Sequence, residues 1–438
     1  MPLQSELTCY KRILAEFEYI ARTWQAPHKR RKIVFADLTL ADILMHKKKL
    51  SKKMAALLKK EAYLFSPLSQ KTIKIGDKVR TIFPLPVMDY IVQRILHQHL
   101  MQHYDPQFSN QLFSYRKGNS AQQATHYFAN YIRQQTHNKR VDLYSYQTDL
   151  CNYTDSIPTH DKAPLWALLD SVYDTMDITP YHKALIKAAI RPYVQRDNSP
   201  TPMPLQQGTP MGTPLTAFIA NLYLSALDHK LNALPGGAYS RFGDDIIFSH
   251  PNKDIVLQQK SVIRNDCASL GLTIKAEKEH LTYLSIPGRP CDDPQFKGCS
   301  AITYLGICIN ATATITFKHN KLHQLICDIR CRIHTTAKLL QHHTKPQKIH
   351  GICHMISNLL TNDTWLTQHA ITNDIRRIND RHTLKQMDYL IALEIAKCVT
   401  GVKSAKAFRY LPYQTLRHHY GLISILTIKN KQLINDCA

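Results

Sequence analysis

The feature that most constrains the fold is a pair of adjacent carboxylates between two apolar half-strands. Residues 239–250 read Tyr-Ser-Arg-Phe-Gly-Asp-Asp-Ile-Ile-Phe-Ser-His. This pattern predicts a hairpin with Gly243 in the turn, because glycine has the backbone freedom that a tight turn requires. Asp244 and Asp245 at its tip would repel each other unless a cation lies between them or water screens them. A surface Asp-Gly turn is the alternative interpretation.

A second predicted strand, residues 141–150, carries another acidic residue near its end. Asp149 stands there, and the chain continues to Asp155-Ser-Ile. If Asp149 and Asp244 meet across paired strands, they form a divalent-metal site of hard oxygen ligands. Such a site suits Mg²⁺, with Mn²⁺ as an alternative, because Mg²⁺ is held by one or two carboxylates, waters and substrate phosphates. Two ions about 3.5–4 Å apart would clamp the attacking and leaving oxygens of a phosphoryl transfer.

A loop rich in glycine and proline lies between these acidic segments and leads into a predicted helix, within residues 207–224. Thr213 is a suitable N-cap, and Pro214 suits the first helical position. Apolar residues then recur at helical spacing and predict a buried face. The loop would let the backbone approach a base pair or a sugar, whereas an ordinary capped helix is the alternative.

Basic charge is concentrated at the two ends of the chain. The 438 residues include 56 Lys and Arg against 33 Asp and Glu, a net charge of +23. Residues 1–60 carry +9 of it, and residues 311–438 carry +11. This excess favours a polyanionic partner, most simply nucleic acid. The basic segment at residues 28–32 is either a phosphate contact or a solvated turn.

The pattern of elements predicts an α+β fold in three regions. Residues 1–69 form a basic helical region, residues 70–310 alternate short strands with helices, and residues 311–438 are basic and helical. No stretch reaches 18 apolar residues, so we expect no membrane span. Eleven irregularly spaced cysteines without an apolar leader predict a cytoplasmic protein with reduced thiols.

The middle region resembles reverse transcriptases of the bacterial branch, which includes group II intron, retron and defence or abortive-infection types. Seven segments match the motifs of that family in the family's order. They are 78–96, 113–124, Asp149 with 155–157, 208–224, 242–245, 271–278 and 304–307. The resemblance implies a right-hand polymerase, with fingers and a ferredoxin-like palm, followed by an α-helical thumb and C-terminal helical region.

The resemblance also implies an activity and a set of metal ligands. The activity is RNA-directed DNA synthesis, in which dNTPs are added to a 3′-hydroxyl. Asp149 and Asp244 would hold both metal ions, the backbone carbonyl of Leu150 would assist, and Asp245 would be an auxiliary acid.

Nucleotide-binding and primer-binding residues follow from the same resemblance. Lys78, Arg80 and Arg116 would hold the triphosphate, where fixed cations stabilise developing charge. Lys278 would protonate the leaving pyrophosphate. The nucleotide pocket would also include Tyr153, Thr154, Met211 and Gly212, and the primer grip would be Tyr304, Leu305 and Gly306. For each basic residue, a solvated surface charge is the alternative.

Two positions depart from the family near the incoming sugar. The family usually has a bulky aromatic residue where this chain has Thr154, and a Gln where it has Met211. Because the aromatic ring excludes a 2′-hydroxyl, we expect weaker rejection of rNTPs. Tyr153 and the neighbouring backbone could instead close the gap.

Several functional alternatives remain open from the sequence. The main hypothesis is an RNA-directed DNA polymerase in antiphage defence, with dNTPs, a DNA product and an RNA template that could be a dedicated non-coding RNA. A template-independent or protein-primed DNA polymerase is the second hypothesis, and an inactive RNA-binding scaffold is the third. A homo-oligomer or a partner protein is compatible with each.

A zinc site among Cys327, Cys331 and His334 or their neighbours lacks the paired C-x-x-C spacing that would favour it.

Overall fold

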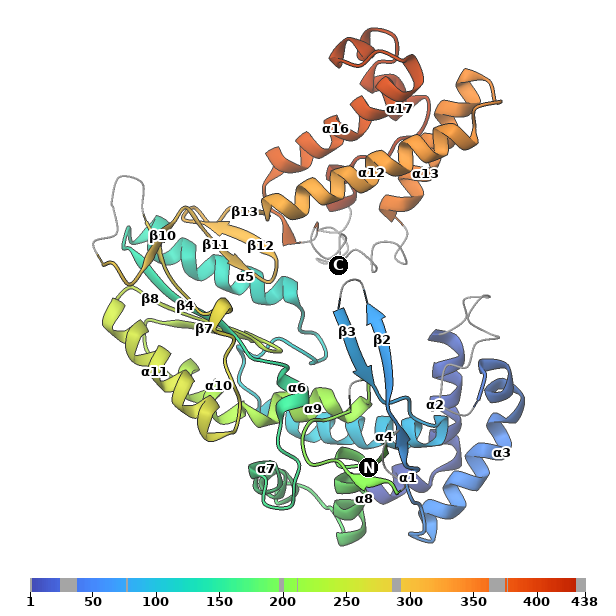
Figure 1. Cartoon of the computed structure of the whole chain (residues 1–438), viewed down its shortest axis with the longest axis vertical. Helices are drawn as coiled ribbons and strands as arrows, with labels where there is room; N and C mark the ends of the chain where they lie inside the picture. The colour runs from blue at the N-terminus through green and yellow to red at the C-terminus, as the bar shows by residue number, and fades with distance from the viewer. Residues whose placement is uncertain are drawn as a thin grey trace. The chain divides into compact units, whose positions relative to one another are not determined.

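The computed structural model describes residues 2–23, 38–75, 78–196, 201–210, 212–285, 293–361, 375 and 377–430, without the side chains of residues 73–80. The chain forms two compact units that are interleaved along the sequence (Figure 1). Unit 1 consists of Met1–Asn119, Tyr146–Phe248 and Asp254–Glu279, and unit 2 of Ser120–Ser145, Ser249–Lys253 and His280–Ala438. The three consecutive regions expected above stay a prediction, and the basic segment 28–32 lies outside the described residues.

Unit 1 begins with three helices that pack on one another, and the first two also pack on a fourth. They are α1 (Leu3–Thr8), α2 (Tyr10–Thr23), α3 (Leu40–Lys59) and α4 (Val87–Tyr104). A capping box starts α3, because Thr39 and Asp42 each accept a hydrogen bond from the other's backbone N–H.

Between α3 and α4, the chain forms a hairpin. Strands β2 (Lys71–Ile75) and β3 (Lys78–Ile82) pair antiparallel, from Lys71 opposite Ile82 to Ile75 opposite Lys78. A small sheet in the order β1-β5-β6 completes this part of unit 1. Its strands are β1 (Leu68–Ser69), β5 (Tyr193–Gln195) and β6 (Met203–Pro204), and two further helices are α7 (Pro164–Tyr173) and α8 (Pro180–Ile190).

Three adjacent strands in the order β4-β8-β7 carry the acidic residues. Their bounds are β4 (Leu143–Asp149), β8 (Asp245–His250) and β7 (Ala238–Phe242). The remaining elements of unit 1 are α6 (Tyr153–Ser156), α9 (Pro214–Tyr223), α10 (Ser225–Asn232), α11 (Lys253–Ser269) and the 3₁₀ turns η2 (Asp105–Gln107) and η4 (Ala276–Lys278). The predicted apolar face of α9 is buried, since Leu215, Phe218 and Ile219 are at most 1% exposed.

Unit 2 combines short strands with long helices. Strands β9 (His280–Leu284) and β10 (Lys297–Cys299) pair parallel, and β11 (Ala301–Tyr304), β12 (Ile307–Asn310) and β13 (Ile315–Phe317) form an antiparallel sheet. Its helical elements are α5 (Ala121–Ile132), the π-helical segment η3 (Arg133–Asn138), α12 (His319–Leu339), α13 (Lys345–Thr361), α16 (Arg381–Thr400), η5 (Ala405–Arg409) and α17 (Tyr413–His418). Helices α12, α13 and α16 pack pairwise. Across the described ranges, no helix combines the length and apolarity that crossing a membrane requires.

Candidate active site

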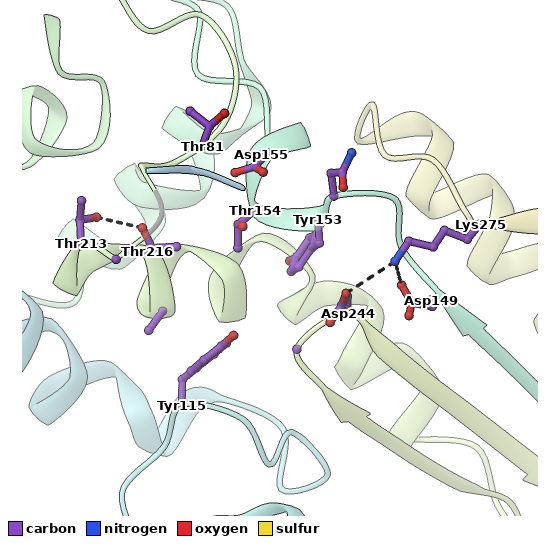
Figure 2. A pocket seen from close by; sticks show the side chains of 14 residues that line it. Thr81, Tyr115, Asp149, Tyr153, Thr154, Asp155, Thr213, Thr216, Asp244 and Lys275 are labelled. Atoms are coloured by element: carbon purple, nitrogen blue, oxygen red, sulfur yellow. Dashed lines mark hydrogen bonds and ion pairs between the residues drawn. The ribbon is translucent and has the colours of Figure 1, made fainter. Parts of the chain in front are cut away.

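Two carboxylates lie at the same end of the strands of unit 1. Asp149 is the last residue of β4, and Asp244 stands in the turn between β7 and the neighbouring strand β8. Gly243 has a φ of 67° in this turn, a left-handed conformation that favours glycine. The predicted hairpin is therefore confirmed, and Asp149 and Asp244 line one cavity, as Figure 2 shows.

The acidic side chains carry negative charge that is only partly compensated. Burial and the Asp149 carboxylate raise the pKa of Asp244 above its usual value. Burial also raises the pKa of Asp245 to about 6, and repulsion from Asp244 and Asp149 adds to this. Asp245 begins β8 and is not among the residues that line the cavity. Burial is the larger cause of both shifts, and the like charges held close together add to it, a repulsion that a bound cation would relieve.

A lysine that sequence reasoning missed faces the carboxylate pair. The ammonium of Lys275 forms an ion pair with Asp149, and its Nζ lies 4.0 Å from Oδ2 of Asp244 (Figure 2). The backbone N–H of Lys275 also donates to the Asp149 carbonyl at 2.9 Å. The family motif that residues 271–278 match has Asn at the position of Lys275. This departure from the motif could have pointed to Lys275 in the sequence.

The carboxylate pair has the chemistry of a divalent-cation site. Its oxygens are hard donors, and both carboxylates line the same cavity, so a positive charge between them would offset their mutual repulsion. Over the described ranges, no three His, Cys, Asp or Glu side chains group as metal ligands. The candidate metal site is therefore the carboxylate pair, and the zinc alternative stays untested.

The cavity beside the carboxylates has a volume of about 1000 Å³. This is the upper end of the range for small-molecule sites. Three predicted nucleotide-pocket residues, Tyr153, Thr154 and Gly212, line it together with the carboxylates. The other lining residues are Thr81, Tyr115, Asn152, Asp155, Thr213, Thr216, Ala217, Gly243 and Lys275.

The Gly- and Pro-rich loop packs directly on the segment that follows β4. The N–H of Gly208 donates to the Ile157 carbonyl at 2.7 Å, and that of Thr209 to the Thr154 carbonyl at 2.8 Å. A Cβ on Gly208 would lie 2.9 Å from the Asp155 carbonyl oxygen, so this contact requires glycine. Thr213 holds the N-cap position of α9, as predicted, although its hydroxyl bonds to the Thr216 hydroxyl at 2.9 Å.

Arg116 is not among the residues that line the cavity, and its predicted role at the triphosphate stays a prediction. Its guanidinium binds both carboxylate oxygens of Asp105, at 2.8 and 3.2 Å, and the backbone carbonyl of that residue at 2.9 Å. It also donates to the carbonyls of Ser109 and Leu112, at 2.8 and 3.3 Å. Because these bonds occupy the guanidinium, the geometry favours a structural role, which the sequence motif alone does not distinguish from phosphate binding.

The structure leaves other predicted nucleotide contacts as predictions. Met211 and the side chains of Lys78 and Arg80 lie outside the described residues. Lys278 ends η4, and its charge lowers the pKa of Asp245, but it does not line the cavity. Leu150 is buried and forms a backbone bridge with Ile274, next to Lys275.

The predicted primer-grip residues belong to unit 2. They form the turn between β11 and β12, where Leu305 and Gly306 have φ values of 48° and 79°. The Arg377 guanidinium donates to the Leu305 carbonyl at 2.8 Å. The Tyr304 side chain is 2% exposed and packs on Phe128, so a nucleic-acid contact here would use the backbone.

A buried arginine beneath the acidic turn was also missed by sequence reasoning. Arg241 is fully buried and binds both carboxylate oxygens of the equally buried Asp228, at 2.6 and 2.7 Å. Its Nη1 donates to the Gly243 carbonyl at 3.2 Å, and its Nη2 to the Asn221 carbonyl at 3.1 Å. Arg241 therefore joins the residue before Asp244 to the end of α9. The signal available in the sequence was a charged residue within a predicted strand.

Comparison with known structures returns weak, distant similarities to telomerases. Apo telomerase from Candida tropicalis, truncated from the C-terminal domain, is 15% identical with a TM-score of 0.44, over 58% of this chain and 55% of that one. Telomerases from Candida albicans and Candida tropicalis, each in complex with a TWJ fragment of telomeric RNA, are 11% and 13% identical, with TM-scores of 0.45 and 0.46. The matches cover 82% and 81% of this chain, and 63% and 64% of those chains. The chain therefore spans less than two thirds of these telomerases.

Two comparisons were made at the level of sequence, one with curated proteins and one with protein families. No curated protein matches the chain significantly. The family described as reverse transcriptase (RNA-dependent DNA polymerase) matches residues 70–309, which is more than half of the chain. The match contains the carboxylate pair, the Gly- and Pro-rich loop and Lys275, and it confirms the right-hand polymerase fold predicted from the motifs. The chain belongs to the reverse transcriptase family.

Proposed function

We propose that the chain is an RNA-directed DNA polymerase that adds dNTPs to a 3′-hydroxyl by two-metal-ion phosphoryl transfer. The observation that carries this proposal is the meeting of Asp149 and Asp244 in one cavity of about 1000 Å³ inside the family region. Mg²⁺ is the proposed metal, with Mn²⁺ as an alternative, because carboxylate oxygens are hard ligands.

Different residues of the cavity would contact the phosphates of a nucleotide and its sugar and base. Asp149 and Asp244 would hold the divalent ions, with the Leu150 carbonyl as a further ligand and Asp245 as an auxiliary acid. When bound, the ions supply a nucleophilic hydroxyl at neutral pH and charge stabilisation for the leaving oxygen. Away from the carboxylates, Thr154 and Gly212 border the space left for the sugar and base.

The finer assignments rest on the motif order and the charge. We assign the chain to the bacterial branch and to antiphage defence, with a dedicated non-coding RNA as template. The positive charge of both chain ends supports a nucleic-acid partner, because Lys and Arg side chains neutralise phosphates. In a bacterial host, the wild-type chain should lower the plating efficiency of phage, and a polymerase-inactive variant should not.

The test of the activity is a double variant, Asp244→Asn with Asp245→Asn. It should abolish dNTP incorporation while leaving the melting temperature and RNA binding of the chain close to the wild-type values. Asp170→Asn is the matched control, because this aspartate is 67% exposed on α7 and does not line the cavity. Unchanged incorporation by the double variant would refute the carboxylate site.

Sequencing the product and the copurified nucleic acid separates the alternatives. Product complementary to a bound RNA supports templated synthesis. Product without a template match, or joined covalently to protein, indicates the template-independent or protein-primed alternative. RNA binding without any product from the wild type indicates an inactive scaffold. Light scattering of the purified chain would show whether it forms a homo-oligomer.

A further inference from the structure

One aromatic side chain projects into the cavity without having been assigned a role. Two of the described lining residues are aromatic, Tyr115 and Tyr153. Tyr115 is 55% exposed, whereas Tyr153 is 4% exposed and donates its buried hydroxyl to the Ala220 carbonyl at 2.6 Å. Rotating Tyr153 into the space beside Thr154 would break that bond. Tyr153 is therefore poorly placed to replace the ring that the family has at position 154.

The backbone around Tyr115 is fixed on both sides. Ser114 is fully buried, and its carbonyl and hydroxyl both bond to the Asn221 side chain, at 2.9 and 3.2 Å. On the other side, Arg116 makes the hydrogen bonds to Asp105, Ser109 and Leu112 described above. Phe113 adds a backbone bond, since its N–H donates to the Arg241 carbonyl at 3.0 Å. The loop thus holds Tyr115 at a set position against α9 and β7.

The conformation of Tyr115 aims its ring at the acidic turn. Its φ of 57° is left-handed, which few residues other than glycine adopt. Its hydroxyl lies 3.8 Å from where a Cβ on Gly243 would stand, an ordinary van der Waals distance that places the ring beside the acidic turn. Figure 2 shows Tyr115 on one side of the cavity, with the side chains of Thr154 and Asp244 on others.

We propose that Tyr115 is the specificity-determining residue that excludes a 2′-hydroxyl from the nucleotide site. The proposal rests on the polymerase function proposed above. With the phosphates at Asp149 and Asp244, the sugar is the next group along the cavity, and Tyr115 is the large exposed ring beside Asp244. Thr154 is too small to fill that space. The ring from the loop therefore replaces the one missing at position 154, so this chain would reject rNTPs despite having Thr154.

The test compares dCTP with CTP, which differ only in the 2′-hydroxyl. The full chain, with a primed RNA template and Mg²⁺, gives kcat/KM for single-nucleotide incorporation. Tyr115→Gly removes the ring while tolerating the left-handed backbone, and it should lower the preference for dCTP by roughly 10–200-fold, the range of small pocket changes. Tyr115→Phe should keep the preference within about threefold of wild type, because the exclusion is steric. Tyr193→Ala is the matched control, since this tyrosine is 58% exposed on β5 outside the cavity.

Three outcomes would overturn the proposal. The first is an unchanged dCTP preference in Tyr115→Gly. The second is an equal loss for dCTP and CTP, which would indicate stacking on the base. The third is a wild type that accepts CTP readily and becomes selective only in Thr154→Phe.

Equilibrium dialysis with labelled dCTP and CTP separates this inference from the proposed polymerase function. Absence of incorporation by the wild type would refute the function. The ratio of the two dissociation constants still tests Tyr115, and it should fall in Tyr115→Gly and stay unchanged in Tyr193→Ala. An unchanged ratio in Tyr115→Gly overturns the inference.

Discussion

Replacing Arg241 should destabilise unit 1 more than any single cavity substitution. Arg241→Met leaves the Asp228 carboxylate without its ionic partner, and both side chains are fully buried in the wild type. Removing one partner of a buried ion pair costs about 3–5 kcal/mol, because the remaining charge stays desolvated. For a unit of this size, that cost corresponds to a fall in melting temperature of roughly 6–20 °C.

A double-mutant cycle isolates the pair by differential scanning calorimetry. Asp228→Asn keeps an oxygen for the Tyr239 hydroxyl, which donates to Asp228 at 2.6 Å, while removing the charge. Combining it with Arg241→Met should recover about 2 kcal/mol or more of the loss, since no unpaired buried charge remains. A melting temperature of Arg241→Met within 2 °C of wild type would refute the reasoning, as would strictly additive losses in the double variant.

Three further predictions concern protons, metal and salt. Burial and the Arg94 charge lower the pKa of His97 to about 4, so the unfolded chain takes up a proton at this residue before the folded chain does as the pH falls below 6.5. The free energy of unfolding therefore decreases by up to about 3 kcal/mol between pH 6.5 and pH 4. In His97→Phe, the fall in melting temperature from pH 7 to pH 5 should be smaller than in wild type, and an identical fall would contradict this. Lys275→Asn removes a cation that competes for Asp149, so Mn²⁺ binding measured by electron paramagnetic resonance should tighten several-fold, and weaker binding would exclude the competition. RNA binding should weaken steeply with salt because phosphate contacts release counterions, so a log–log slope near zero would rule out an electrostatic interface.

The sequence predicted those parts of the site that depend on local pattern. The hairpin at Asp244, the strand ending at Asp149 and the capped helix after Thr213 each follow from periodicity and turn chemistry within a few residues. Their meeting in one cavity followed from the expected pairing of two strands. The family match to residues 70–309 confirms that the motif order was informative.

The residues that were missed depend on long-range packing. Lys275 reaches Asp149 across 126 positions, and Ser114 bonds to Asn221 across 107. No periodicity reports such contacts, and for Arg116 the motif suggested a phosphate contact although Asp105 already occupies the guanidinium. The motif comparison identified which residues are present, whereas only the folded chain shows which hydrogen-bond and ion-pair partners each residue has.

The interleaving of the two units has a consequence for synthesis on the ribosome. Unit 1 needs segments that end at Asn119, Phe248 and Glu279, so its carboxylate site cannot close until well over half of the polypeptide has emerged. Until then, Asp149 and Asp244 lack Lys275, which compensates part of their charge, and apolar strands stay exposed to aggregation. Shortening the gene to the N-terminal half would therefore yield a fragment without a catalytic centre, and low-temperature or chaperone-assisted expression should favour the intact chain.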